Sequence, residues 1–173
     1  NIQVKDLKVL DYPPLTEDLE EAKEHLDLYG MALIKNVLSS DEVDQMDKRL
    51  TEQFYGEEKF KVGSKVRGDE GFGVESSEEE KVSRLVWNLI NKGDCFLQLI
   101  DHPKILPLIQ HIIGERVCLC SMGAHMNGSG NERMALHQDQ WPLVPHPMDF
   151  AFMANVMYLI SDNSEENGGT RLI

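Results

Sequence analysis

The feature that most constrains the fold is a change in the spacing of apolar residues near residue 115. Before it, apolar side chains recur every three or four residues, which is the period of a helix with one buried face. From Arg116 onward the period moves towards two, the spacing of a half-buried strand. Helices followed by strands favour an α+β arrangement, or a β-barrel with a helical buttress.

Capping residues indicate where the first two helices begin. We expect Thr16 to cap a helix that ends at Gly30. Ser39 stands three residues before Glu42, which is the spacing of a capping box, so a second helix is expected to start there. Apolar residues at helical spacing predict the buried faces of the two helices: Leu19, Ala22, Leu26 and Tyr29 in the first, and Val43, Met46, Leu50 and Phe54 in the second.

The stretch 56–80 differs from its surroundings. It mixes five glycines with lysines, arginine and acidic residues, and the glycine spacing fits neither a dinucleotide fingerprint nor a P-loop. We expect a flexible surface loop. Because long loops in compact domains often cover binding sites, a further hypothesis is that its basic residues close over an anionic substrate group.

The remaining elements follow from apolar spacing and turn residues, and the whole of 1–173 is expected to form a single domain. Residues 1–114 would be mainly helical and 115–173 would supply the first strands of the core. The expected elements are a short buried strand at 31–34, helices at 82–90 and 103–114, strands at 117–126, before His137 and at 150–160, and a polar turn at 161–169. The apolar run at 150–160 also fits a buried helix.

Charge and cysteine content exclude several classes of protein. A formal net charge of −13 argues against a general attraction to nucleic acid or to an anionic membrane. No apolar run is long enough to span a bilayer. The three cysteines show no Cys-x-x-Cys zinc spacing and are interpreted as reduced thiols, so a cytoplasmic or other reducing intracellular compartment is expected.

The strongest chemical signal is the pair His137 and Asp139, one residue apart. At the end of a strand, residues i and i+2 point to the same side. An imidazole and a carboxylate on one side can occupy two adjacent positions on a metal ion. They match two of the three ligands in the 2-His-1-carboxylate triad of non-heme Fe(II) oxygenases.

Four segments resemble the phytanoyl-CoA dioxygenase-like family of Fe(II)- and 2-oxoglutarate-dependent oxygenases. They occur in the family's order and cover most of the chain. The segments are 25–39, with its helix, glycine, strand and Leu-Ser helix start; 99–106, which contains Asp101-His102-Pro103; Leu136-His137-Gln138-Asp139-Gln140-Trp141; and 165–173, which contains Asn167-Gly168-Gly169-Thr170.

The resemblance implies a double-stranded β-helix core, a jelly roll of the cupin-like type, with an N-terminal helical buttress. It implies that His137 and Asp139 are the first two iron ligands, and that Gln138 and Asn155 contact 2-oxoglutarate or substrate. Asp139, where halogenating relatives leave the coordination site open, favours hydroxylation. Fe(II) would be the metal, with 2-oxoglutarate and O₂ as co-substrates.

The chain also departs from the family pattern. The third ligand, a histidine, and the arginine that binds 2-oxoglutarate are expected beyond Ile173. About four or five strand candidates are present, against roughly eight in a closed jelly roll. We therefore expect that the C-terminal part of the core is missing from this chain and that the protein is longer.

The resulting hypothesis is an Fe(II)/2-oxoglutarate oxygenase that hydroxylates a small organic substrate, such as an acid, a CoA ester or a secondary metabolite, with release of succinate and CO₂. A second hypothesis is a non-catalytic jelly-roll binding protein that lacks a complete triad. A third is a cupin-like metalloenzyme that uses another metal without 2-oxoglutarate. A small-molecule substrate is the expected partner, with no nucleic acid and no membrane.

Overall fold

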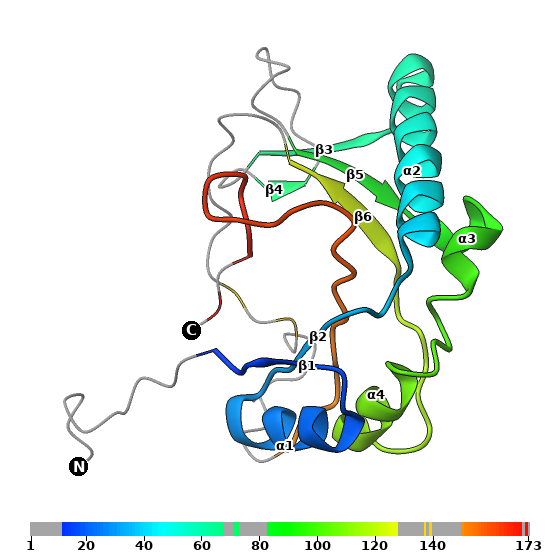
Figure 1. Ribbon diagram of the computed structural model, residues 1–173. Helices are drawn as coiled ribbons and strands as arrows, with labels where there is room; N and C mark the ends of the chain where they lie inside the picture. The colour runs from blue at the N-terminus through cyan, green and yellow to red at the C-terminus, as the bar shows by residue number, and fades with distance from the viewer. Residues whose placement is uncertain are drawn as a thin grey trace.

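The computed structural model describes residues 12–67, 71–72, 83–127, 137, 139, 150–170 and 172. A long helix, α2, lies against an antiparallel sheet of order β4-β3-β5-β6, while α1, α4 and a small parallel sheet lie at the other end (Figure 1). These elements are α1 (Leu19–Tyr29), α2 (Ser40–Phe60), α3 (Asp94–Leu97), α4 (Leu106–Ile113), β1 (Leu15–Thr16), β2 (Leu33–Ile34), β3 (Ser64–Arg67), β4 (Gly71–Phe72), β5 (Ser83–Trp87) and β6 (Gly123–Met126), with a 3₁₀ turn, η3, at Leu89–Asn91.

Strand β5 is central to the four-stranded sheet. Leu85 lies opposite Ser64 on β3 and opposite His125 on β6, and both pairings are antiparallel. Leu85 and Val86 point to opposite faces, yet they are only 1% and 0% exposed, so both faces of the sheet are covered at this point. The sheet is thus part of the folded core.

The helix predicted at 82–90 is wrong, because residues 83–87 form β5. Leu85, Val86 and Leu89 fit a helical face, but a short apolar run fits a buried strand equally well. Pairing on both edges gives the backbone N–H and C=O groups of β5 hydrogen-bond partners. These partners come from strands that are distant in the sequence, so the local sequence does not reveal them.

The loop predicted at 56–80 is also wrong where the structure describes it. Helix α2 continues through Gly56 and ends at Lys61, whose φ of 55° is left-handed. Strands β3 and β4 then pair as an antiparallel hairpin. Residues 68–70 and 73–80 lie outside the described residues.

The capping box at the start of α2 is confirmed. The Ser39 hydroxyl accepts a hydrogen bond from the Glu42 backbone N–H at 3.3 Å, and the Glu42 carboxylate accepts one from the Ser39 N–H at 2.8 Å. These two bonds satisfy donors that the first helical turn leaves unpaired.

Helix α1 ends at Gly30 as predicted, with a φ of 72°, but Thr16 does not cap it. Asp18 is the cap, because its carboxylate accepts from the N–H groups of Glu20 and Glu21 at 2.8 and 3.1 Å. Thr16 lies in β1, which pairs in parallel with β2. The buried strand expected at 31–34 is shorter in the structure, because only Leu33 and Ile34 form β2, and Leu33 is 37% exposed.

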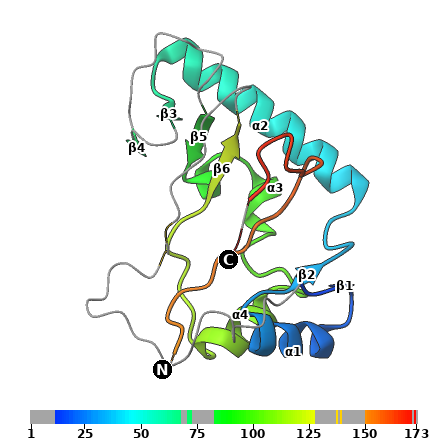
Figure 2. The same cartoon turned by 90° about the vertical axis from the view of Figure 1, so that its left-hand side faces the viewer.

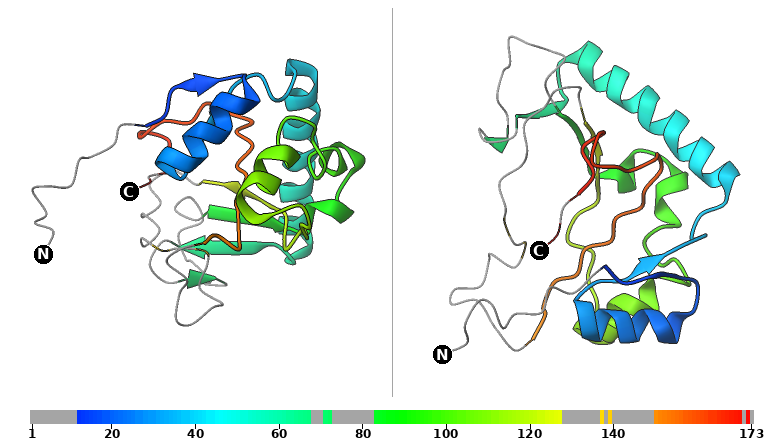
Figure 3. Two further views of the ribbon diagram at one scale, coloured as in Figure 1. Left: turned by 90° about the horizontal axis from the view of Figure 1, so that it is seen from below. Right: turned by 60° about the vertical axis from the view of Figure 1, so that its left-hand side comes forward.

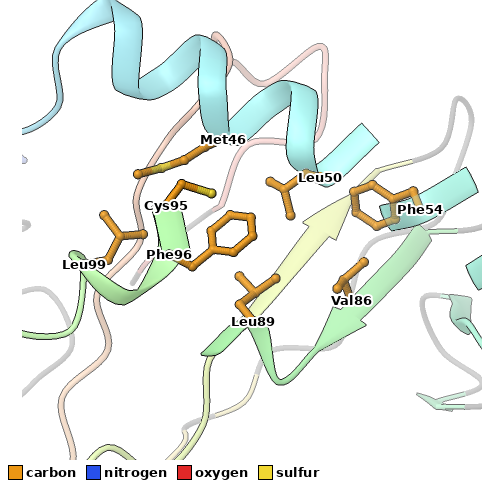
Figure 4. Close-up of a cluster of buried hydrophobic side chains, with 8 residues drawn as sticks. All are labelled: Met46, Leu50, Phe54, Val86, Leu89, Cys95, Phe96 and Leu99. Carbon is orange, nitrogen blue, oxygen red and sulfur yellow. The ribbon is translucent and has the colours of Figure 1, made fainter. Parts of the chain in front are cut away.

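The main core lies between α2, α3 and β5 (Figure 4). Helix α4 packs beside α1, and His111 Nε2 lies 2.8 Å from Asp27 Oδ1 across that contact (Figure 3). Helix α4 starts at Leu106, after the predicted Pro103, and ends at Gly114 as predicted. The core cluster consists of Met46, Leu50, Phe54, Val86, Leu89, Cys95, Phe96 and Leu99.

The last part of the chain forms less strand than its apolar pattern predicts. Only residues 123–126 of the predicted strand at 117–126 pair, because the β5 partner ends at Trp87 and the chain turns into η3. Residues 150–160 run from the end of the molecule that holds α1 and α4 towards the sheet (Figure 2), but they form no strand with any described residue. Several large apolar side chains of this segment are exposed, so the apolar run provides by itself neither burial nor a strand partner: Phe150, Val156, Met157 and Leu159 are 59%, 40%, 60% and 57% exposed.

The polar turn predicted at 161–169 is confirmed. The Asn167 side chain accepts from the Ser164 N–H at 2.7 Å and donates to the Asp162 carbonyl at 2.6 Å. Asn127, after β6, donates to the Gly168 carbonyl at 3.3 Å, which joins this turn to the sheet.

The α+β class is confirmed by these elements. Among the described residues, no helix is both long and apolar enough to cross a bilayer.

Candidate metal centre

The structure brings together the two residues that the sequence singled out as metal ligands. His137 Nε2 lies 3.6 Å from Asp139 Oδ1. About half of each side chain is exposed, so both groups can be reached from solvent. One imidazole nitrogen and one carboxylate oxygen therefore lie close together at a position open to solvent.

Asn155 completes this local arrangement. Its amide Nδ2 donates a hydrogen bond to Asp139 Oδ2, the carboxylate oxygen that does not face His137. The amide thus engages one carboxylate oxygen while the other stays directed at the imidazole. A hydrogen bond to an ionised acceptor is stronger than a neutral one, so this contact orients the carboxylate.

The geometry fits two neighbouring ligands of an octahedral ion. Ligand bonds of about 2.1 Å at a right angle place the two donor atoms roughly 3.0 Å apart. The observed 3.6 Å requires a movement smaller than 1 Å, which a side-chain rotation supplies. Imidazole nitrogen and carboxylate oxygen are also the donor types of non-heme Fe(II) sites.

A third ligand does not come from the part of the chain that the structure describes. No group of three or more His, Cys, Asp or Glu side chains that could hold a metal occurs among these residues. A metal ion held by His137 and Asp139 would therefore need at least one further ligand from outside these residues.

The remaining residues near the predicted site are placed as follows. Gln138, predicted to lie near the co-substrate, is outside the described residues. His125 lies on β6 opposite Leu85, and partial burial lowers the pKa of its imidazole, which favours the neutral form. Asn155 donates a hydrogen bond to the carboxylate of Asp139, and its predicted contact with 2-oxoglutarate or substrate stays a prediction.

Sequence reasoning missed the bond between Asn155 and Asp139. The two residues are 16 positions apart, and no local pattern pairs them. The only available signal was a polar side chain within the apolar run 150–160. It marked Asn155 as unusual without indicating its partner.

A His-x-Asp pair open to solvent also occurs in several families of proteins with a mononuclear metal site. Comparison with protein families identifies the family of this chain. Residues 26–173 match the model of the phytanoyl-CoA dioxygenase (PhyH) family, and the chain belongs to that family. The match includes His137, Asp139 and Asn155.

A curated relative agrees with this assignment. Dioxygenase af480 of Aspergillus fumigatus is 27% identical over 159 residues, which cover 92% of this chain and 49% of the relative. The chain thus spans about half the length of that relative. Comparison with solved structures found no match.

Proposed function

We propose that the chain contributes the His-x-Asp half of an Fe(II)- and 2-oxoglutarate-dependent oxygenase. The enzyme hydroxylates a small organic substrate, an acid, a CoA ester or a secondary metabolite, and releases succinate and CO₂. The observation that carries the proposal is the 3.6 Å approach of His137 Nε2 to Asp139 Oδ1 in a chain of the phytanoyl-CoA dioxygenase family. A jelly-roll core for the whole protein is part of the same proposal.

His137 and Asp139 would hold the metal, and each contributes a different property. The imidazole supplies a neutral nitrogen, and the carboxylate supplies an oxygen whose charge offsets part of the ion's charge. When bound, Fe(II) with 2-oxoglutarate and O₂ supplies the oxidising chemistry, while the protein orients the substrate and excludes side reactions. Gln138 is proposed to lie near the co-substrate.

The presence of Asp139 supports hydroxylation over halogenation within this chemistry. A carboxylate at this position fills a coordination site that a halide would otherwise take, so hydroxylation is favoured over halogenation. The proposed partner is the small-molecule substrate alone, in a compartment that keeps Cys95, Cys118 and Cys120 as the free thiols that the structure shows.

The test uses protein produced from its complete gene. Without oxygen, Fe(II) and 2-oxoglutarate should together produce the visible charge-transfer absorbance of the chelate, and neither should produce it alone. On addition of oxygen, succinate should form. His137→Ala and Asp139→Ala should abolish both signals, whereas His111→Ala on α4 and the exposed Asp44→Ala on α2 should retain them. Absence of the absorbance and of succinate in the unmodified protein would refute the proposal.

A second candidate is favoured by one observation: the described residues offer only two of the ligands that a metal needs. A non-catalytic jelly-roll binding protein would show no turnover and would be indifferent to His137→Ala. A cupin-like metalloenzyme with another metal would keep its activity when 2-oxoglutarate is omitted. The absorbance and succinate assays therefore separate the proposed oxygenase from both alternatives, and metal-dependent activity without 2-oxoglutarate separates the two alternatives from each other.

A further inference from the structure

The contact between Asn155 and Asp139 supports a role for Asn155 that differs from direct contact with co-substrate. Asn155 Nδ2 donates to Asp139 Oδ2, while Asp139 Oδ1 is the oxygen 3.6 Å from His137 Nε2. A carboxylate binds a metal through one oxygen or through both. The amide engages one lone pair of Oδ2 and so holds the carboxylate in the orientation in which Oδ1 lies 3.6 Å from His137 Nε2.

We infer that Asn155 is a positioning residue that acts through Asp139: it holds the carboxylate so that a single oxygen, next to His137 Nε2, binds the metal. This inference rests on the proposed function, because it presupposes that His137 and Asp139 bind a metal. It goes beyond that function by assigning a role to a side chain that need not touch metal, co-substrate or substrate.

The segment that carries Asn155 is attached to the core independently of the metal. Three residues further on, the Tyr158 hydroxyl donates to the Leu99 carbonyl at 2.9 Å. Tyr158 and Ile160 also pack against the core cluster, of which Leu99 is a member. The orange segment in Figure 1 shows this path, which runs from the lower end of the molecule up along the sheet.

Because this segment is attached to the core, the hydrogen bond from Asn155 can orient the carboxylate of Asp139. A donor on a mobile chain would follow the carboxylate, whereas a donor on a segment tied to the core fixes its direction. Groups that hydrogen-bond to metal ligands orient them, and their loss typically weakens metal binding by roughly 10- to 100-fold. Preorganisation of Asp139 by Asn155 is expected to act in this way.

The decisive measurement is the affinity for Fe(II) without 2-oxoglutarate, because a residue that only contacts the co-substrate cannot affect it. We would measure it anaerobically by competition with a coloured chelator, on protein from the complete gene. Asn155→Leu removes the donor at similar size, and Asn155→Gln keeps an amide donor. The same change at the exposed Asn91, Asn91→Leu, is the matched control.

Asn155→Leu should weaken Fe(II) binding by about 10- to 100-fold, with a smaller loss in Asn155→Gln and none in Asn91→Leu. With Co(II) in place of Fe(II), the visible spectrum should also change in Asn155→Leu, because a released carboxylate can bind through both oxygens. A role limited to folding would alter the melting temperature without altering this spectrum. If Asn155→Leu fails to fold by circular dichroism, Asn155→Ala provides the same comparison.

Other results overturn the inference and show whether the proposed function survives. An Fe(II) affinity of Asn155→Leu within about twofold of the unmodified protein, with His137→Ala unable to bind, would refute the positioning role and leave the proposed function intact. An unchanged Fe(II) affinity with weaker 2-oxoglutarate binding would assign Asn155 to the co-substrate. Failure of the unmodified protein to bind Fe(II) would refute both.

Discussion

The Tyr158 hydroxyl donates to the backbone carbonyl of Leu99 at 2.9 Å, joining the segment of Asn155 to the main core across 59 residues of sequence. His102 meets the Tyr158 ring edge-on, at 6.4 Å between ring centroids. Partial burial raises the pKa of Tyr158 to about 12, so the phenol is protonated and donates at neutral pH. This bond links the stability of the core to the geometry at Asp139.

Removing this hydroxyl should destabilise the protein. Tyr158→Phe leaves the Leu99 carbonyl without this donor, and an unsatisfied buried acceptor costs about 1–2 kcal/mol of unfolding free energy. Urea unfolding followed by circular dichroism measures the loss. Tyr55→Phe, at a side chain 68% exposed on α2, is the control and should change stability by less than about 0.5 kcal/mol. Equal effects of the two changes would contradict this account of the bond.

The stability that Tyr158 contributes should depend on alkaline pH. A tyrosine in the unfolded chain ionises near its ordinary pKa of about 10, whereas the pKa of folded Tyr158 is about 12. Between these values the unfolded state holds fewer protons than the folded state, so the unfolding free energy falls as pH rises. The difference in unfolding free energy between the unmodified protein and Tyr158→Phe should be largest at neutral pH and should decrease above about pH 10. If urea unfolding gives the same difference in unfolding free energy from neutral pH up to about pH 11, the ionisation of Tyr158 does not affect stability as predicted.

A buried ion pair fixes α2 to the turn after β5. Glu57 is 8% exposed and accepts from Lys92 Nζ at 3.0 Å and from Gln53 Nε2 at 2.8 Å. Lys92→Met leaves a buried carboxylate with one donor fewer, and we expect a loss of about 1–3 kcal/mol in urea unfolding. The double variant Glu57→Leu with Lys92→Met should recover part of this loss, because it leaves no unpaired charge.

The control for that pair is an ion pair of similar length on the surface. Lys23 Nζ lies 2.6 Å from Glu20, whose side chain is 80% exposed. Lys23→Met should cost less than about 1 kcal/mol, because exposed pairs contribute little. If the double variant Glu57→Leu with Lys92→Met is no more stable than Lys92→Met alone, an unpaired charge does not explain the stability lost in Lys92→Met.

Replacing Gly30 and Gly56 by alanine should change the unfolding free energy in opposite directions. Gly30 has a φ of 72° and Gly56 lies inside α2, and a Cβ at either position would meet no atom within 4 Å. Gly30→Ala should therefore cost about 1–2 kcal/mol from backbone strain alone. Gly56→Ala should stabilise the protein by about 0.5–1 kcal/mol, because alanine loses less backbone entropy in a helix. Thermal unfolding of the two variants tests this, and a shift of the same sign in both would rule it out.

The capping box at α2 should contribute measurably. Ser39→Ala removes the side-chain acceptor for the Glu42 N–H, and loss of such a cap typically costs about 1 kcal/mol. Hydrogen bonds from Ser39, backbone first, lower the pKa of Glu42. Because the folded pKa lies below the unfolded one, this contribution is present at neutral pH and is lost as pH falls through the folded pKa. Ser40→Ala, one residue later, is the control, and urea unfolding in which both variants lose equally would argue against the cap.

Local signals predicted much of the helical part correctly. Ser39 and Glu42 form the predicted capping box, and Gly30 and Gly114 end helices as expected. Such features depend on residues within one helical turn, so the sequence around them contains the necessary information. The error at Thr16 has the same origin, since Asp18, two residues on, is an equally suitable cap.

Strands were predicted less well because a strand depends on its partner. Residues 83–87 form the centre of the sheet through pairing with β3 and β6, although their apolar spacing also fits a helix. Residues 150–160 are as apolar as a buried strand, yet among the described residues they find no strand to pair with. Apolar spacing reports which side chains avoid water and leaves the pairing of the backbone undecided.

At the candidate metal centre, the sequence by itself determined the ligand types and their spacing. His137 and Asp139 are one residue apart, and this proximity in the chain keeps imidazole and carboxylate within reach of one ion. Only the tertiary structure decided that Asn155 meets Asp139 and that Tyr158 ties the segment of Asn155 to Leu99. The physical reason is distance along the chain: residues 16 and 59 positions apart meet only through the fold of the chain between and around them, and no local pattern specifies that fold.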